Sequence, residues 1–182
     1  MIEYVRMQAT TMQKINDLTL PGEIVIFGST YMSNFPMYEL VNKSMIESAV
    51  YNRSIRGLTV RDALEIVEEC VISLRPGKIF VSLGEEDENT PNVISLYNRL
   101  IFLLRSALPE CELYLIGLTG TYTESFNQNL IHLCDGKKVR SIHFTTENIT
   151  ETELYKVRFK QLSCYFRRNS MTISDAVYVL SI

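Results

Sequence analysis

Hydrophobic residues in this chain form short continuous runs that are separated by longer segments of mixed polarity. The runs lie at Glu23–Phe27, Lys78–Leu83, Glu112–Leu118 and Val139–Phe144, with a shorter one at Ala49–Asn52. Continuous apolar runs of this length are typical of strands that are covered on both faces. The pattern therefore predicts a mostly parallel sheet of about five strands.

The segments between these runs predict helices. The clearest spans Thr59–Leu74, where apolar residues recur three and four positions apart. Thr59 stands at the N-cap position with Asp62 three residues later, and Arg75-Pro76-Gly77 ends the helix. Further helices are expected at Phe35–Ile46, Pro91–Ala107 (with Pro91 as its first residue), Ser125–Cys134 and Glu151–Phe166, with an extra N-terminal helix at Ile2–Leu18 and a strand-like tail at Ala176–Ile182.

Strands that alternate with helices imply βαβ crossovers, so the expected fold is α/β. We predict a flavodoxin-like three-layer α/β/α sandwich that forms a single domain over residues 1–182. Ligands of such folds bind beyond the carboxyl ends of the strands, where the strand order reverses. The first and third strands flank that point, so the loops Gly28–Tyr31 and Gly84–Asp87 are the expected site.

Composition narrows the class of protein. The 182 residues include 18 Lys and Arg against 21 Asp and Glu, a net charge of −3, so nucleic acid is not the expected partner. The longest apolar stretches, Ile24–Phe27 and Leu100–Leu104, are too short to cross a membrane. The N-terminus lacks the apolar core of a signal peptide. Four scattered cysteines without a C-x-x-C pair argue against zinc and disulfides and favour the cytoplasm.

At the two candidate loops the sequence resembles the SGNH, or GDSL-type, esterases and acylhydrolases. The resemblance spans about Glu23–Tyr178 and is carried by IVIFGSTYM, YNRSIRGLTVRDAL, VSLGEEDEN, NVISLYNRLIFLLRSALPECELYLIGLT, SFNQNLIHLC and MTISDAVYVLS. In order and spacing these segments follow the family's Gly-Asp-Ser, Asn-Arg-Gly, Gly-x-Asn-Asp and Asp-x-x-His blocks. The resemblance implies an SGNH-hydrolase-like fold and a small ester or carbohydrate-type ligand.

When the family's functional positions are carried over residue by residue, this sequence has a different residue at nearly every position that performs the family's chemistry. It places the nucleophile at Thr30 with Ser29 in the Asp position, the oxyanion-hole positions at Ser54 and Glu86, and the Asp and His positions at Asp175 and Tyr178. Only Asp175 keeps its identity. Ser54 retains a backbone N–H that could serve as a donor.

The replacements predict impaired acyl transfer. An ionised Glu86 has no proton to donate and repels the oxyanion, and losing one such donor typically costs about a hundredfold in rate. The Tyr178 phenol keeps its proton at neutral pH and so cannot accept one from a nucleophile. We therefore expect a catalytically impaired or inactive protein that retains a binding pocket. The alternative is a divergent esterase that uses Thr30 or Ser29 with Glu86 or Asp87 as base.

Several features leave two interpretations open. The acidic run Glu85–Glu88 is either a cation site or, as we favour, a solvated loop. Asn52 and Arg53 either bind an anion or brace their loop against the core. The two histidines, His132 and His143, are expected to be structural.

A remote alternative function is flavin binding. FGSTYMSN resembles the phosphate loop of flavodoxins, but Tyr31-Met32 stands where that loop has glycine, and the chain has no tryptophan to stack on a flavin. We expect neither a cofactor nor a metal. The sequence leaves open whether the chain binds a protein partner or forms a homo-oligomer.

Overall fold

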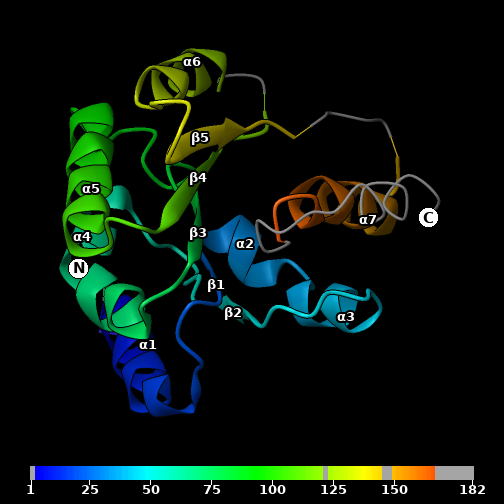
Figure 1. The fold of residues 1–182 in the computed structure, drawn as a ribbon. Coiled ribbons are helices and arrows are strands. Elements are labelled where there is room, and N and C mark those ends of the chain that lie inside the picture. The colour runs from blue at the N-terminus through cyan, green and yellow to red at the C-terminus, as the bar shows by residue number, and fades with distance from the viewer. Residues whose placement is uncertain (1–2, 121–122, 145–148, 167–182) are drawn as a thin grey trace.

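Five parallel strands form the centre of the part of the chain that this computed structural model describes, residues 3–120, 123–144 and 149–166 (Figure 1). The strands are β1 (Ile24–Gly28), β2 (Val50–Asn52), β3 (Lys78–Ser82), β4 (Glu112–Ile116) and β5 (Val139–Ile142). Their order is β2-β1-β3-β4-β5, and Ile24 pairs with Val50 on one side and Lys78 on the other. The predicted α/β fold with a five-stranded parallel sheet is confirmed.

Helices cover both faces of the sheet and complete three layers (Figure 1). One face carries α1 (Glu3–Lys14), α4 (Val60–Cys70), α5 (Val93–Ala107) and α6 (Glu124–His132), and the other carries α2 (Thr30–Asn34), α3 (Met37–Asn42) and α7 (Glu151–Ser163). Two short 3-10 helices, Asn16–Leu18 and Ile72–Leu74, follow α1 and α4. The predicted N-terminal helix is therefore α1 together with its 3-10 extension.

Three predicted helices differ in their bounds. The helix expected at Phe35–Ile46 is the shorter α3, which begins after Pro36 and ends at Asn42. The short helix α2 before it was not predicted, and Pro36 separates the two because it holds Phe35 in an extended conformation. The helix expected from Pro91 begins at Val93, since Asn92 adopts a left-handed φ of 58°. The helix expected to reach Leu74 ends as α4 at Cys70 and continues as 3-10. The predicted tail at Ala176–Ile182 lies outside the described residues.

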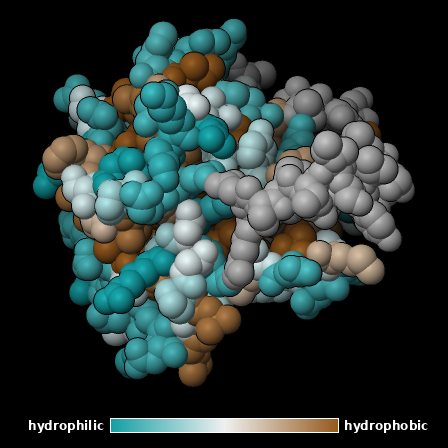
Figure 2. Space-filling model, viewed as in Figure 1, coloured by the Kyte–Doolittle hydropathy of each residue, from teal (hydrophilic) through white to brown (hydrophobic). Residues whose placement is uncertain are grey.

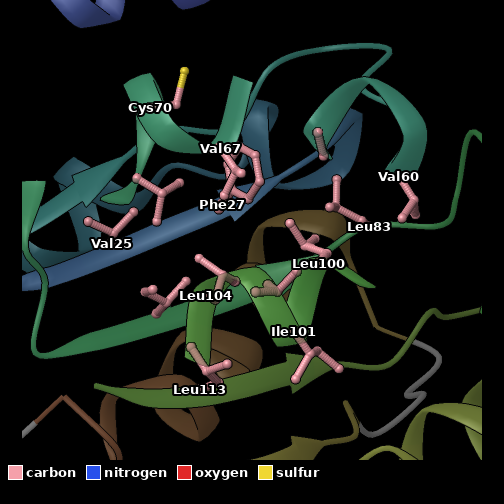
Figure 3. Close-up of a cluster of buried hydrophobic side chains, with 14 of the residues drawn as sticks. Val25, Phe27, Val60, Val67, Cys70, Leu83, Leu100, Ile101, Leu104 and Leu113 are labelled. Atoms are coloured by element: carbon pink, nitrogen blue, oxygen red, sulfur yellow. The ribbon is translucent and has the colours of Figure 1, made fainter. Parts of the chain in front are cut away.

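The alternation of side chains along each strand divides the core into two clusters. Val25 and Phe27 of β1 face α4 and α5, whereas Ile24 and Ile26 face α2, α3 and α7. Figure 3 shows the first cluster, in which side chains from the sheet and the two helices meet. These four side chains of β1 are at most 2% exposed, which explains why each of them is apolar.

The surface seen in Figure 2 is largely hydrophilic, with hydrophobic patches that are separate from one another. Among the described residues, no helix combines the length and the apolar character that crossing a membrane requires.

Candidate functional site

Three loops converge at the carboxyl edge of the sheet because β1 lies between β2 and β3. The Ser29 N–H donates to the Ser82 carbonyl at 3.0 Å, and the Ile55 N–H donates to the Gly28 carbonyl at 3.0 Å. Gly28 is needed at this crossing, since a Cβ there would lie 2.8 Å from the Ser82 oxygen. The predicted loops therefore lie side by side at the point where the strand order reverses.

Thr30 occupies the centre of this edge. Its Oγ1 accepts the N–H of Gly57 at 3.0 Å and donates to Oε1 of Glu86 at 2.5 Å. The structure thus joins the expected nucleophile position and one expected oxyanion position directly, and it places the loop that contains Ser54 beside them. Asp175 and Tyr178 lie outside the described residues, so their predicted contact with Thr30 stays a prediction.

The acidic loop after β3 is bonded to the protein rather than solvated throughout. Glu85 accepts the N–H of Tyr31 at 2.7 Å, and Asp87 accepts the N–H of Val60 at 2.9 Å. These carboxylates supply acceptors to donors in the first turns of α2 and α4, where negative charge is stabilised. Of the interpretations left open, a solvated loop is therefore wrong for Asp87, which is 3% exposed, whereas Glu85 and Glu86 are exposed and also form hydrogen bonds. No set of three acidic, His or Cys residues in the described part of the chain could hold a metal ion.

Burial raises the pKa of two carboxyl groups in this loop. Desolvation raises the pKa of Asp87, and hydrogen bonds from Val60 and Thr90 partly oppose the rise. Desolvation also raises the pKa of Glu85, which the hydrogen bond from the Tyr31 backbone lowers and the nearby charge of Glu86 raises. Glu85 is nevertheless exposed overall, so its shift has little effect on stability.

Asp87 should therefore make stability depend on pH. Its raised pKa means that the folded state binds a proton at Asp87 more tightly than the unfolded state does. The stability that this proton adds to the folded state is therefore present at acidic pH and is lost as pH rises through the folded pKa. We expect Asp87→Asn, which keeps an oxygen acceptor for Val60, to gain stability relative to the wild type as pH rises from 4 to 7. Urea denaturation at several pH values measures this difference. A difference that stays constant or shrinks as pH rises would contradict the prediction.

The segment after β2 braces the site. Asn52 donates from Nδ2 to the Met32 carbonyl at 2.9 Å, and its Oδ1 accepts the N–H of Ser54 at 3.1 Å. Arg53 is 3% exposed and donates to the Met12 carbonyl near the end of α1. The structure favours bracing over anion binding for this pair. It also corrects the expectation that the Ser54 N–H is available as an oxyanion donor, because Asn52 already accepts it.

Arg158 is a residue of this region that the sequence analysis missed. It extends from α7 and is 5% exposed, and its Nη1 donates to Oη of Tyr31 at 2.6 Å. The guanidinium carbon lies 5.1 Å from the ring centre of Tyr31 and 5.3 Å from that of Phe144. Burial raises the pKa of Tyr31, and the positive charge of Arg158 opposes that rise. The available signal was the helical spacing of Arg158 from Tyr155 and Leu162, which places a charge on a largely apolar face.

Neither histidine reaches Thr30. His132 ends α6, and His143 follows β5, where it lines a cavity of about 380 Å³ together with Asn127 and Phe144. In the strand order β5 is three positions from β1, a separation of roughly 14 Å at the usual strand spacing. Within the described part of the chain, Thr30 therefore has Glu86 and no imidazole as a hydrogen-bonded base.

Comparisons with known proteins agree on the fold. No family model matches the sequence, and no curated protein matches it. A candidate platelet activating factor from Streptococcus pneumonia superposes with a TM-score of 0.77 at 17% identity, over 91% of this chain and 94% of that one. A candidate acylhydrolase from Bacteroides fragilis gives 0.70 at 14% identity, over 91% and 98%.

A GDSL-like lipase from Bacteroides thetaiotaomicron gives a TM-score of 0.69 at 12% identity, over 90% of this chain and 98% of that one. The chain thus has the fold of the GDSL-like lipases and acylhydrolases, which confirms the resemblance at the level of fold. At these identities the comparison is one of architecture, so activity has to be argued from the residues around Thr30.

Proposed function

We propose that this chain is a protein of SGNH-hydrolase fold with little or no esterase activity, which binds a small polar ligand at the carboxyl edge around Thr30. The observation that carries the proposal is the state of the Thr30 hydroxyl. It is held between the N–H of Gly57 and the carboxylate of Glu86. The hydroxyl can still contact a ligand, but its only hydrogen-bonded base among the described residues is a carboxylate, which activates a hydroxyl much less than imidazole does.

The donors that acyl transfer would need are already in use. The Tyr31 N–H donates to Glu85, the Gly57 N–H to Thr30, and the Ser54 N–H to Asn52. A tetrahedral intermediate formed at Thr30 would carry its negative charge beside Glu86, whose ionised carboxylate repels it. Because each missing oxyanion donor typically costs about a hundredfold or more, a slow or absent reaction is expected.

Support for ligand binding comes from position. The loops around Thr30 lie at the switch point of an open parallel sheet, which is where α/β proteins of this kind bind ligands. Two structural neighbours were solved with sugars: a family two carbohydrate esterase from Clostridium thermocellum with cellohexaose, and a two-domain esterase active on acetylated mannans with mannopentaose. A small ester or carbohydrate-type ligand is consistent with these neighbours.

A second candidate function is a divergent esterase. The same hydrogen bond favours it, because a hydroxyl that donates to a carboxylate has the geometry of a nucleophile and its general base. A carboxylate is a much weaker base towards a hydroxyl than imidazole is. The first proposal is therefore preferred.

Hydrolysis of p-nitrophenyl acetate and longer-chain p-nitrophenyl esters at neutral pH tests both candidates. We expect the wild type to release nitrophenol no faster than Thr30→Ala or Ser29→Ala, because neither hydroxyl is activated. Thr11→Ala, a change in an exposed residue of α1, is the matched control. Turnover that is lost in Thr30→Ala and kept in Thr11→Ala would overturn the first proposal and establish the second.

A further inference from the structure

Hydrophobic side chains are concentrated on the outer side of α1 and on the turn that follows it. Among the described residues, five of the eleven large hydrophobic side chains that are exposed lie between positions 4 and 20: Tyr4, Met7, Ile15, Leu18 and Leu20. The other six are spread between Tyr38 and Tyr165. Single exposed hydrophobic residues are ordinary, whereas a group of them on one surface marks an interaction site.

The opposite side of α1 already packs against the domain. Val5 and Ala9 are 0% exposed and belong to the core cluster that α1 shares with α4, and Arg6 forms an ion pair with Glu69 of α4. The helix is therefore fixed at the edge of its layer, next to α4 (Figure 1). Because its outer side is a fixed surface, a partner can bind there with little cost of ordering.

The exposed residues form one stripe because of their spacing. Tyr4, Met7, Thr11, Ile15 and Leu18 are three or four positions apart, which places them along one side of a helix. The helical path continues past the end of α1, since the N–H groups of Ile15 and Leu18 each donate to the carbonyl three residues earlier at 3.1 Å. We call these five residues the outer stripe. All five are exposed.

The outer stripe reads the same in both directions along the chain. Its steps are three, four, four and three residues, with Thr11 at the centre. If two copies of α1 run antiparallel and cross at Thr11, Tyr4 of each faces Leu18 of the other, and Met7 faces Ile15. A closed two-fold contact requires a surface that is complementary to itself in this way. The pattern therefore fits a second copy of this chain.

The polar residues of α1 fit the same arrangement. The Thr11 hydroxyl donates to the Met7 carbonyl at 2.9 Å, so burial of Thr11 at the centre leaves no unsatisfied donor. Glu3 lies in the first turn of α1 and Lys14 in its last turn. Antiparallel pairing directs the acidic start of each helix towards the basic end of the other and opposes the helix dipoles, whereas parallel pairing brings like charges together.

We propose that this chain forms a two-fold symmetric dimer through antiparallel pairing of α1 along the outer stripe. The inference goes beyond the proposed function and does not depend on the residues around Thr30. A specific interface buries at least about 1,000 Å² in total. A contact along roughly 24 Å of helix lies at the lower end of that range. We therefore expect a dissociation constant in the micromolar range.

Sedimentation velocity of the whole protein tests the inference. Between about 1 and 200 µM, which brackets a micromolar dissociation constant, the mass should rise from 21.0 kDa towards twice that value. Met7→Glu and Ile15→Glu should each raise the dissociation constant at least about a hundredfold, because two-fold symmetry places the new carboxylate in the contact twice. Phe102→Glu is the matched control, since Phe102 is equally a large exposed side chain, 68% exposed, but lies on α5.

Cross-linking tests the orientation of the two helices. The background carries Cys134→Ser and Cys164→Ser, which remove the two cysteines that are not buried. A bismaleimide that spans about 8 to 10 Å, the usual distance between packed helix axes, should link two copies of the Thr11→Cys variant. It should not link two copies of Tyr4→Cys, because antiparallel pairing separates these positions by about 20 Å. Gln13→Cys, on another side of α1, is the second negative control.

Three results would each overturn the inference. The first is a protein that stays monomeric over the whole concentration range, and the second is a loss of dimer in Phe102→Glu as large as that in Met7→Glu. The third is cross-linking of Tyr4→Cys or Gln13→Cys as efficient as that of Thr11→Cys. Thermal unfolding verifies that each variant is folded, and Ile15→Glu decides alone if Met7→Glu is not. None of these results alters the ester assay, so the proposed function is tested separately.

Discussion

Replacing Phe27 by alanine should lower the free energy of unfolding by about 3 to 5 kcal/mol. Phe27 is 0% exposed in the second half of β1 and packs in the cluster that joins the sheet to α4 and α5 (Figure 3). Alanine would leave a cavity that a close-packed core fills only in part. For a protein of this size the melting temperature should fall by roughly 10 °C.

Phe102→Ala is the matched control for this substitution. Phe102 lies on α5 with 68% of its surface exposed, so the same change of side chain should alter stability by about 0.5 kcal/mol or less. Urea denaturation of both variants gives the comparison. Similar losses in the two variants would mean that the side chain of Phe27 is not in the core.

Gly84→Ala should have the second largest effect, a loss of about 2 to 4 kcal/mol, because two penalties add. Gly84 has a φ of +114°, which residues with a Cβ rarely adopt, and a Cβ there would lie 2.4 Å from Cζ of Phe126 on α6. Relief of the clash would move the start of the acidic loop.

Gly136→Ala separates the two penalties. Gly136 also has a positive φ, +70°, but no atom lies within 4 Å of the added Cβ, so only the backbone cost of about 1 kcal/mol applies. In the Phe126→Ala background, where the ring is absent, Gly84→Ala should likewise cost little more than that. Chemical denaturation checks both expectations. If Gly84→Ala were no more destabilising than Gly136→Ala, the contact between Gly84 and Phe126 would be refuted.

Much of the fold followed from local pattern. The central strands β1, β3 and β4 are short runs that are buried on both faces, and such runs are typical of a parallel sheet between helices. The ends of the helices were harder to predict, because each end depends on the backbone conformation of a single residue. Asn92 in a left-handed conformation delays α5 by two residues relative to the prediction. Pro36 holds Phe35 in an extended conformation, so the helix predicted from Phe35 begins at Met37, and α2 before it was not predicted.

The site was predictable only in part. Thr30 and Glu86 could be paired in advance, because they follow β1 and β3, and parallel neighbours end at the same edge. The hydrogen-bond partners of Glu85 and Asp87 could not be predicted, since a run of acidic residues looks the same in a sequence whether it is solvated or bonded to helix N-termini. Arg158 lies 127 residues from Tyr31 along the chain, and no local pattern specifies that contact.

The sequence by itself determined the strands, the alternation with helices and the loops that would meet, because hydrophobic periodicity and turn residues act over a few neighbouring positions. Only the tertiary structure decided how the polar groups pair. It assigns the Ser54 N–H to Asn52, the Thr30 hydroxyl to Glu86, and the guanidinium of Arg158 to Tyr31. Hydrogen bonds need distances near 3 Å between groups far apart in the chain, and packing of the helices on the sheet sets those distances.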